Sequence, residues 1–448
     1  MMLDRPVRSV EALAFRYPVA TPVRTSFGIM HDRPAVFVRI EDADGAVGWG
    51  EVWCNFPTVG AEHRARLVNE LLAPLVVGQT FATPRDAFDV MTAKTAVLAL
   101  QSGEVGPLAQ GIAGIDIALW DLAARRGAKP LWRLLGGDER RVPVYASGIN
   151  PDAPERTVRT MRERGHRAFK LKIGFGAALD MRNLDAVRQE AGPGVFVAAD
   201  ANQAWSLDET LSVVERLAPF DLRWLEEPLH ADRPWSEWRA LREASPVPLA
   251  AGENIAGFAA FAEALQQDVL SVVQPDVAKW GGVSGCLAVG QDIVRSGATY
   301  CPHYLGGGIG LLASAHLLAA VGGPGMLEVD VNENPLRDAL CGPVADVRDG
   351  AIVLHDGPGL GIDPDLAPLR RFKVDEQRVS RRAKSGWRRV LRGLGLKRLA
   401  KSAKARGVSV VPKRERYEPA KHYMRGPGPK ARAAGTGADG GRTESGRD

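Results

Sequence analysis

Polar residues recur at a regular interval between Lys170 and Glu328, each at the end of an apolar run. Successive lead residues lie 23 to 28 positions apart. They are Lys172, Asp200, Glu226, Glu253, Asp276, His303 and Glu328. One strand-plus-helix unit of a parallel barrel takes roughly 30 residues. The spacing therefore predicts that these residues lie at the carboxyl ends of successive strands, where the polar side chains of a barrel converge on one site.

Segments with helical periodicity alternate with the predicted strands in the same part of the chain. The predicted strands are 142–147, 195–200 and 222–226, and the predicted helices are 156–164, 179–190 and 207–218. This alternation favours an α/β fold with a parallel barrel over an antiparallel sandwich.

A different pattern precedes the barrel. Residues 5 to 55 are typical of antiparallel strands with a hairpin turn at Asp44-Gly45, and residues 62 to 135 keep helical apolar faces. A polar loop from Val19 to Arg33 is expected to close over the barrel. We therefore predict an α+β capping domain, a barrel domain, a segment that packs back on the capping domain, and a tail. Their expected bounds are 5–135, 140–335, 336–372 and 373–448.

Charge is distributed unevenly along the chain. The whole sequence has 58 basic and 53 acidic residues. From Lys373 onward, 22 basic and 7 acidic residues give +15, so the 36 basic and 46 acidic residues of 1–372 give −10. The basic character belongs to the tail, which we expect to be mostly disordered and without a role in the chemistry. The folded part is expected not to bind nucleic acid, because it is acidic.

Cysteine usage and hydropathy predict a cytoplasmic protein with no membrane partner. The four cysteines are scattered, without the spacing of a metal site or a disulfide framework. Residues 1–10 lack the apolar run that a signal peptide requires, so none is expected. The most apolar window, 310–327, contains polar residues and a Gly-Gly-Pro-Gly break, so it predicts helix, loop and strand rather than a membrane span.

Three carboxylates fall at the ends of three consecutive predicted strands. They are Asp200, Glu226 and Glu253. Any one of them alone is as readily a salt-bridged barrel residue. In phase with the strand period, the three fit a hard divalent cation, since Mg²⁺ prefers oxygen ligands and keeps free positions for substrate.

The other strand ends carry residues that can move protons. Lys170 and Lys172 alternate by two, so they share one face of a strand, and a neighbouring cation is expected to lower a lysine pKa. Asp276 is expected to orient His303 and raise its basicity. Glu328, if it stays protonated, is expected to donate to a developing oxyanion.

This residue set resembles the enolase superfamily and, within it, the mandelate racemase group. The segments 116–122 and 134–137 also resemble that family, and the likeness covers roughly residues 5 to 372. The resemblance implies a capping domain with a modified (β/α)₇β barrel. It also implies Mg²⁺ on the three carboxylates and two acid/base groups on opposite faces of the substrate, Lys172 and His303. Lys170 and Glu328 would contact the substrate carboxylate.

The expected substrate is a small carboxylate, and the expected protein is a homo-oligomer. Further predicted substrate contacts are Asn202, Lys279, Arg24 and His31. The leading hypothesis is an acid-sugar dehydratase that forms a 2-keto-3-deoxy acid. A 2-hydroxy-acid racemase is the alternative, followed by a cycloisomerase. A nucleic-acid-binding protein that acts through its tail is the hypothesis from another class.

Overall fold

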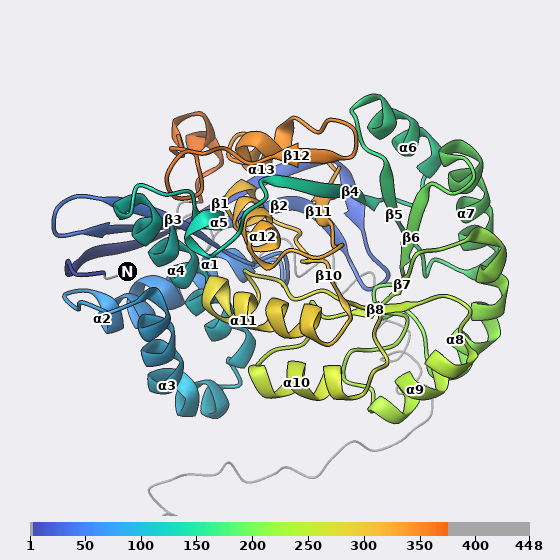
Figure 1. Cartoon of the computed structure of the whole chain (residues 1–448), viewed down its shortest axis with the longest axis horizontal. Helices are drawn as coiled ribbons and strands as arrows, with labels where there is room; N and C mark the ends of the chain where they lie inside the picture. The colour runs from blue at the N-terminus through green and yellow to red at the C-terminus, as the bar shows by residue number, and fades with distance from the viewer. Residues whose placement is uncertain (1–2, 375–448) are drawn as a thin grey trace, which may run out of the picture. The chain divides into compact units, whose positions relative to one another are not determined.

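The predicted strands form one curled parallel sheet in the computed structural model, which describes residues 3–374. The order in the sheet is β10-β9-β8-β7-β6-β5-β4-β11. The ends of this path meet where the Met326 N–H donates to Cys301 Sγ at 3.4 Å. With helices between successive strands (Figure 1), this is the predicted (β/α)₇β barrel.

The parallel strands are short, and the helices that connect them are longer. The strands are β4 (Arg141–Ile149), β5 (Ala168–Lys172), β6 (Phe196–Asp200), β7 (Leu225–Glu226), β8 (Leu249–Ala251), β9 (Val272–Val273), β10 (Thr299–Tyr300) and β11 (Leu327–Asp330). The helices are α6 (Pro154–Glu163), α7 (Ala177–Ala191), α8 (Leu207–Val214) with the 3₁₀ turn η2 (Glu215–Phe220), α9 (Trp235–Ala244), α10 (Phe258–Gln266), α11 (Gly282–Arg295) and α12 (Gly308–Val321).

Residues on β5 alternate between the inside and the outside of the barrel, as expected of a strand. Phe169 and Leu171 pack outward in the large core shared with the helices, whereas Ala168 belongs to a small inner cluster. Lys170 and Lys172 share the face of Ala168. Both lysines therefore point into the barrel, above its apolar floor.

The capping domain combines an antiparallel sheet with helices. Its strands are β1 (Val7–Arg24), β2 (Ile29–Asp42) and β3 (Val47–Val52). Its helical elements are α1 (Gly60–Arg66), the π-helix η1 (Leu67–Leu72), α2 (Ala73–Val76), α3 (Pro84–Ser102), α4 (Val105–Arg126) and α5 (Leu131–Leu134). The sheet lies beside α12 and the barrel (Figure 1).

The predicted polar loop from Val19 to Arg33 is wrong. β1 and β2 form one long hairpin, with Val23 paired to Met30 and a turn closed by the Thr25 N–H to the Gly28 carbonyl (2.9 Å). β-branched residues before the turn fit a pleated surface, and pairing satisfies their backbone groups. Only residues 25–28 remain as a loop.

Helix α4 packs closely on β3 through glycines. A Cβ atom at Gly114 would lie 2.4 Å from Val52 Cγ2 and 3.2 Å from Val38 Cγ2. At Gly106 of the same helix, a Cβ atom would find only the end of Gln110, at 3.9 Å. The helix-to-sheet distance is thus set at Gly114.

Gly114→Ala is expected to destabilise the protein by about 1–3 kcal/mol, because the added methyl overpacks a close contact. Gly106→Ala, in the same helix, is the matched control and is expected to cost no stability, since alanine is the better helix former. Chemical denaturation of both variants gives the comparison. Equal midpoints for the two variants would show that the α4–β3 distance is not constrained.

The segment after the barrel contacts both domains. Its elements are α13 (Pro335–Asp338), η3 (Gly342–Ala345), β12 (Ala351–Val353) and η4 (Ala367–Phe372). β12 pairs antiparallel with β4. Phe372 packs edge-on against Tyr17 (ring centroids 5.1 Å apart), and the Val374 N–H donates to the Ala14 carbonyl at 2.9 Å. The predicted tail, apart from residues 373 and 374, lies outside the described residues.

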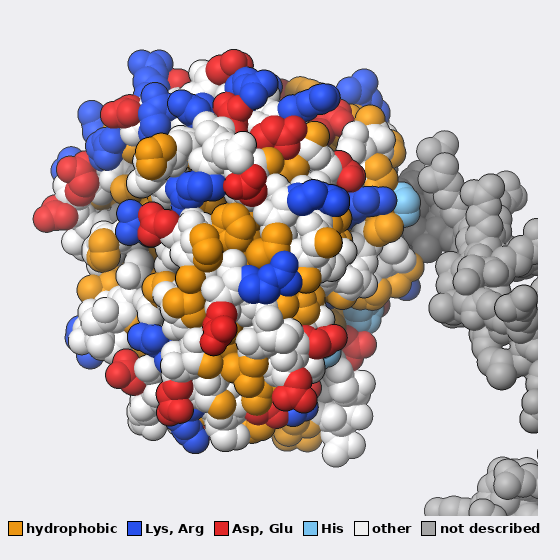
Figure 2. Space-filling view, turned by 90° about the vertical axis from the view of Figure 1, so that its right-hand side faces the viewer, with side chains coloured by type: hydrophobic (Ala, Val, Ile, Leu, Met, Phe, Trp, Pro, Cys, Tyr) orange, Lys and Arg blue, Asp and Glu red, His pale blue; other side chains and the backbone are white. Residues whose placement is uncertain are grey.

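Two surface properties bear on the predicted partners. Among residues 3–374, no helix is long and apolar enough to cross a membrane. On the face shown in Figure 2, Lys and Arg side chains are interspersed with Asp and Glu. That face therefore has no continuous basic surface of the kind nucleic acids bind.

Candidate functional site

The predicted polar strand ends lie at one level of the barrel. Lys172 of β5 is in register with Asp200 of β6, and Asp200 is in register with Glu226 of β7. Glu253, Asp276 and His303 lie in the loops that follow β8, β9 and β10. The sheet topology thus brings the residues predicted from spacing to the same end of the barrel.

The two lysines contact different carboxylates. Lys172 Nζ donates to Asp200 Oδ2 at 2.5 Å. Lys170 Nζ, fully buried, donates to both oxygens of Glu226 at 2.7 and 2.8 Å and lies 2.7 Å from Glu328 Oε1. Lys170 is therefore enclosed by acids, and Lys172 is nearer the opening.

The predicted fall in lysine pKa depends on a neighbouring metal cation and stays a prediction, because the protein's own groups act in the opposite direction. Burial disfavours the charged form of Lys172, but the attraction of Asp200 outweighs burial and the pKa of Lys172 is raised. The pKa of Lys170 is raised well above its usual value, because Glu226 and Glu328 more than offset its burial. The sequence-based prediction counted a metal and a second lysine but not the excess of nearby carboxylates.

The charges around Glu328 of β11 favour its ionised form, whereas its predicted role as a donor requires the protonated form. Burial favours its neutral form, but the Lys170 ammonium and His303 hold the pKa of Glu328 below its usual value. Its oxygens accept hydrogen bonds from the Ser147 hydroxyl and, at 3.1 Å, from the Tyr304 N–H. In this state Glu328 is an acceptor only.

Asp276 and His303 form the predicted pair. His303 Nδ1 lies 2.7 Å from Asp276 Oδ2, and the other oxygen of Asp276 accepts the Ala278 N–H at 2.8 Å. The imidazole Nε2 lies 2.9 Å from Glu253 Oε2. Although burial opposes it, this acidic surrounding raises the pKa of His303 well above 6.5. Asp276 fixes the ring so that Nε2 faces the carboxylates.

Two predicted substrate contacts line the same end of the barrel. The N–H and side-chain amide of Asn202 donate to Asp200 at 2.8 and 3.1 Å, which leaves its buried Oδ1 without a partner. Lys279 Nζ lies 2.8 Å from Asn254 Oδ1, 3.3 Å from Glu253 Oε2 and over the Trp53 ring at 4.8 Å. Both side chains can reach a ligand held by the carboxylates.

The other two predicted substrate contacts do not join this cluster. Arg24 is half exposed and pairs with Asp152 at 3.4 Å. His31 is exposed on β2. Both residues belong to strands of the long β1–β2 hairpin, and neither lies in the loop that was expected to close over the barrel. The turn itself does reach the barrel, because the Ser26 hydroxyl donates to the Asn202 carbonyl at 2.6 Å.

The three carboxylates predicted to bind Mg²⁺ each contact a basic side chain. Within residues 3–374, no three acidic, histidine or cysteine side chains are gathered as a ready metal site. Asp200 faces Lys172, Glu226 faces Lys170, and Glu253 lies between His303 and Lys279.

The donor set nevertheless fits a hard dication, because acids outnumber bases at this end of the barrel. Burial and the neighbouring acids raise the pKa of Glu226 to about 7 despite Lys170, and the pKa of Glu227 well above its usual value. A divalent cation would balance this surplus. The acids are Asp200, Glu226, Glu227, Glu253, Asp276 and Glu328, and the bases are Lys170, Lys172, Lys279 and His303.

Sequence reasoning missed several buried partners of the carboxylates. Gln274 Nε2 and Trp224 Nε1 donate to Glu226 at 2.7 and 3.1 Å. Gln274 lies two positions before Asp276, and Ser147 ends the predicted first strand. A search for polar residues at the carboxyl ends of strands could therefore have found both. Trp53 and Asn55 come from the capping domain, and no spacing signal pointed to them.

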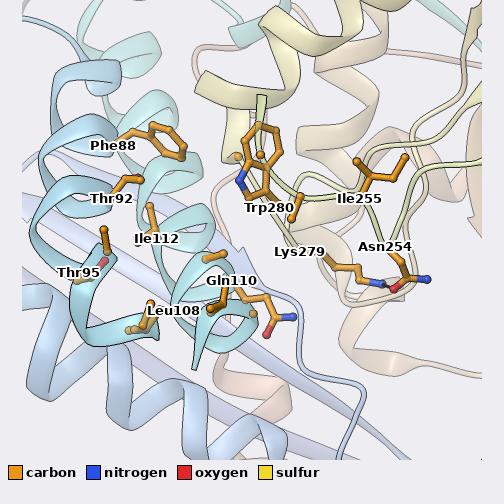
Figure 3. Close-up of a pocket in the computed structure, with 18 of the residues that line it drawn as sticks. Phe88, Thr92, Thr95, Leu108, Gln110, Ile112, Asn254, Ile255, Lys279 and Trp280 are labelled. Atoms are coloured by element: carbon orange, nitrogen blue, oxygen red, sulfur yellow. Dashed lines mark hydrogen bonds between the residues drawn. The ribbon is translucent and has the colours of Figure 1, made fainter. Parts of the chain in front are cut away.

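A cavity of about 490 Å³ adjoins the cluster between α3, α4 and the loops that contain residues 253–257 and 279–281. Its walls are mainly apolar, with Phe88, Ile112 and Trp280 facing it (Figure 3). The hydrogen-bonded pair Lys279 and Asn254 lies at the edge of the cavity (Figure 3), and Lys279 Nζ is also 3.3 Å from Glu253 Oε2. Of the acids and bases at this end of the barrel, only Glu253 and Lys279 line the cavity, so it is a neighbour of the candidate site and not its centre.

Comparison with known proteins decides the family. The model of the mandelate racemase/muconate lactonizing enzyme N-terminal domain matches residues 8–136, and the enolase C-terminal domain-like model matches residues 153–367. D-galactarolactone cycloisomerase of Agrobacterium fabrum is 30% identical over 386 residues, which cover 83% of this chain and 99% of that protein. The chain belongs to the mandelate racemase/muconate lactonizing enzyme family of the enolase superfamily. The predicted resemblance is confirmed.

Members of this family similar to the chain carry different activities. Arabinonate dehydratase of Saccharolobus solfataricus is 30% identical over 340 residues, which cover 74% of this chain and 88% of that protein. Similar proteins therefore include acid-sugar dehydratases as well as cycloisomerases and racemases. Family membership gives this chain a group of reactions and not one substrate.

Solved structures of the family agree with the fold. A mandelate racemase/muconate lactonizing enzyme of Bordetella bronchiseptica RB50 has a TM-score of 0.78 and 57% identity, covering 82% of this chain and 99% of that one. A racemase of Streptomyces coelicolor with bound magnesium has a TM-score of 0.73 and 29% identity, covering 82% and 100%. An enolase of Bradyrhizobium complexed with magnesium and mandelic acid has a TM-score of 0.72 and 30% identity, covering 84% and 100%. Relatives thus bind magnesium and a small carboxylate.

Proposed function

We propose that this protein is a Mg²⁺-dependent acid-sugar dehydratase, which converts an aldonate or aldarate into a 2-keto-3-deoxy acid. Asp200, Glu226 and Glu253 form a row of carboxylates across the site. The observation that carries the proposal is the hydrogen-bonded Asp276–His303 pair, which contacts this carboxylate row at Glu253, while Lys172 contacts it at Asp200. This arrangement supplies a base for the α-proton and an acid for the departing hydroxyl.

In the proposed reaction, Lys172 removes the proton on the carbon next to the substrate carboxylate. Lys170 donates to that carboxylate, and Asn202, with its free amide oxygen, contacts a hydroxyl. Asp200, Glu226 and Glu253 would hold Mg²⁺. When bound, Mg²⁺ supplies positive charge that stabilises the developing dianion and offsets the Asp200 charge that keeps the proton on Lys172.

His303 completes the proposed reaction as the acid. Asp276, 2.7 Å from Nδ1, balances the charge of the imidazolium that donates the proton, and the neutral ring can take the α-proton of the opposite epimer. The proton passes from Nε2 to the 3-hydroxyl as the carbon–oxygen bond breaks, so water leaves and an enol remains. The enol then gains a proton on C3 to become the 2-keto-3-deoxy acid. Dehydratase relatives named for acid sugars support this choice.

A racemase of a 2-hydroxy acid is the second candidate. Lys172 lies on β5 and His303 lies in the loop after β10, so they reach the carboxylates from different parts of the barrel. Such a pair can remove a proton from one face of the substrate and return it to the other. The same geometry serves both reactions. The difference lies in whether the substrate has a hydroxyl that His303 can protonate.

Incubation of the Mg²⁺-loaded protein with a panel of aldonic and aldaric acids is expected to yield a 2-keto-3-deoxy acid from at least one of them, detected as its semicarbazone. Sugar lactones and simple 2-hydroxy acids belong in the panel, because a cycloisomerase would act on the former and a racemase on the latter. Epimerised acid without keto acid, or an isomerised lactone, would contradict the dehydratase proposal.

A further inference from the structure

Two buried acids of the capping domain have no place in the proposed reaction. Glu51 lies on β3 and Asp116 lies on α4, and their relative exposures are 1% and 0%. Neither is a member of the carboxylate row. Both accept hydrogen bonds from the starts of barrel helices, which lie far away in the sequence.

Glu51 caps helix α12. Its Oε1 accepts the Gly307 N–H at 2.5 Å and its Oε2 accepts the Gly310 N–H at 2.9 Å. The first N–H groups of a helix need outside acceptors, and α12 has no side chain of its own that caps its start and no acid in its first turn. The capping domain thus supplies an N-cap that the barrel lacks.

Asp116 does the same for helix α11. Its Oδ2 accepts the Ser284 N–H at 2.9 Å and its Oδ1 accepts the Ser284 hydroxyl at 2.6 Å. α11 likewise has no side-chain cap of its own and no acid in its first turn. Trp120, also on α4, adds a hydrogen bond from Nε1 to the Ser284 hydroxyl at 2.8 Å.

Glycines at both helix starts make room for these acids. A Cβ atom at Gly307 would lie 2.6 Å from Glu51 Oε1, and one at Gly282 would lie 2.4 Å from Asp116 Oδ2. Any larger residue would displace the carboxylate. The close approach is therefore built into both chain segments.

The two capped helices directly follow the loops of the proposed acid/base pair. α11 begins at Gly282, shortly after Asp276, and α12 begins at Gly308, shortly after His303. Two further contacts reach the same loops from the chain just after β3. The Trp53 N–H donates to the Ala278 carbonyl at 3.2 Å and Asn55 Nδ2 to the Leu305 carbonyl at 2.6 Å.

We infer that Glu51 and Asp116 are positioning residues, which hold Asp276 and His303 at hydrogen-bond distance by fixing the helices that follow their loops. The catalytic consequence rests on the proposed function. In the part of the chain that the structure describes, no such helix cap positions Lys172. Its strand, β5, is held by pairing with β4 and β6. The turn of the β1–β2 hairpin contacts the barrel near Lys172 through the Ser26 hydroxyl, which donates to the Asn202 carbonyl. Loss of either acid is therefore expected to impair one face of the site.

The test compares Glu51→Gln and Asp116→Asn with Asp121→Asn. Asp121 is a third buried acid of the capping domain, but it accepts the N–H groups of Trp49 and Leu360 and contacts Arg125. It controls for the loss of a buried carboxylate. Burial raises the pKa of Glu51 and of Asp116 to about 7, so the measurements are made at pH 8, where both are ionised.

Exchange of the substrate α-proton in D₂O, followed by NMR for each epimer of an accepted acid, reads the two faces separately. Both variants are expected to slow exchange on the His303 face by about 10²-fold, the cost of a misplaced catalytic group, and on the Lys172 face by less than about twofold. Asp121→Asn is expected to leave the ratio of the two faces unchanged. Equal slowing of both faces, or no slowing, in folded variants would overturn the inference.

Amide hydrogen exchange measured by mass spectrometry keeps the test separate from the proposed function. Glu51→Gln is expected to speed exchange in residues 303–311, and Asp116→Asn in residues 278–286, with neither change in Asp121→Asn. If the unaltered protein exchanged no α-proton of any acid, the proposed function would fail and these segments alone would decide the inference. Unchanged protection in both segments would then refute it.

Discussion

Replacement of Glu226 by Gln is expected to abolish Mg²⁺ binding and to lower turnover by more than about 10³-fold, as expected when the charge that stabilises a transition-state dianion is lost. Glu226 is the middle one of the three carboxylates, and Lys170, Gln274 and Trp224 hold its oxygens in place. Isothermal titration with Mg²⁺ and steady-state kinetics on an accepted acid give the two readouts. EDTA treatment of the unaltered protein is expected to give the same loss, which added Mg²⁺ reverses.

The matched control is Glu263→Gln, which makes the same change on the exposed face of α10. It is expected to retain both metal affinity and turnover. Glu226→Gln is expected to remain folded, because Lys170 keeps Glu328 as a partner at 2.7 Å. Full turnover in thoroughly stripped protein, or unchanged Mg²⁺ affinity in Glu226→Gln, would contradict the assignment of the three carboxylates.

Much of the barrel could be predicted because its period is visible in one dimension. Each strand ends in a polar residue, and parallel strands of one sheet end on the same side, so the interval alone placed Lys172, Asp200 and Glu226 at one level. Alternation along β5 likewise predicted that Lys170 and Lys172 share a face. These are local or periodic properties, and they require no knowledge of distant contacts.

The capping domain was harder to predict where its contacts are distant. The segment around Val19 to Arg33 contains Pro, Gly and His, which are typical of a loop, but pairing across a long hairpin overrode that preference. The capping contacts of Glu51 on α12 join residues 256 positions apart. Neither property leaves a periodic trace in the sequence.

Protonation states are harder to predict from a sequence than positions. The prediction for Lys172 considered a metal and Lys170, whereas the pKa of Lys172 depends on the balance between its burial and all nearby charges. The same balance ionises Glu328 through Lys170 and His303. A sequence names the acids at a barrel mouth, but it does not give the distances that decide which of them keeps a proton.

Separate loss of the two acid/base groups is expected to divide the reaction by face. Lys172→Ala is expected to slow α-proton exchange in D₂O by about 10²–10⁴-fold for one epimer of an accepted acid, and His303→Asn for the opposite epimer. The reason is their placement. Lys172 contacts Asp200 at one end of the carboxylate row, and His303 contacts Glu253 at the other.

Lys94→Ala on α3 and His355→Asn are the surface controls, since both side chains are exposed and lie outside the proposed chemistry. Each control is expected to exchange both epimers at the unaltered rate. His303→Asn is also expected to stop formation of the keto acid, because His303 is the acid that releases the 3-hydroxyl. Lys172→Ala is expected to keep α-proton exchange on the His303 face. If His303→Asn lost exchange for neither epimer but still failed to form keto acid, His303 would serve the leaving group alone, and the two-face assignment would be wrong. If it still formed keto acid at the unaltered rate, the dehydration would need another acid, such as Lys279, whose Nζ lies 3.3 Å from Glu253.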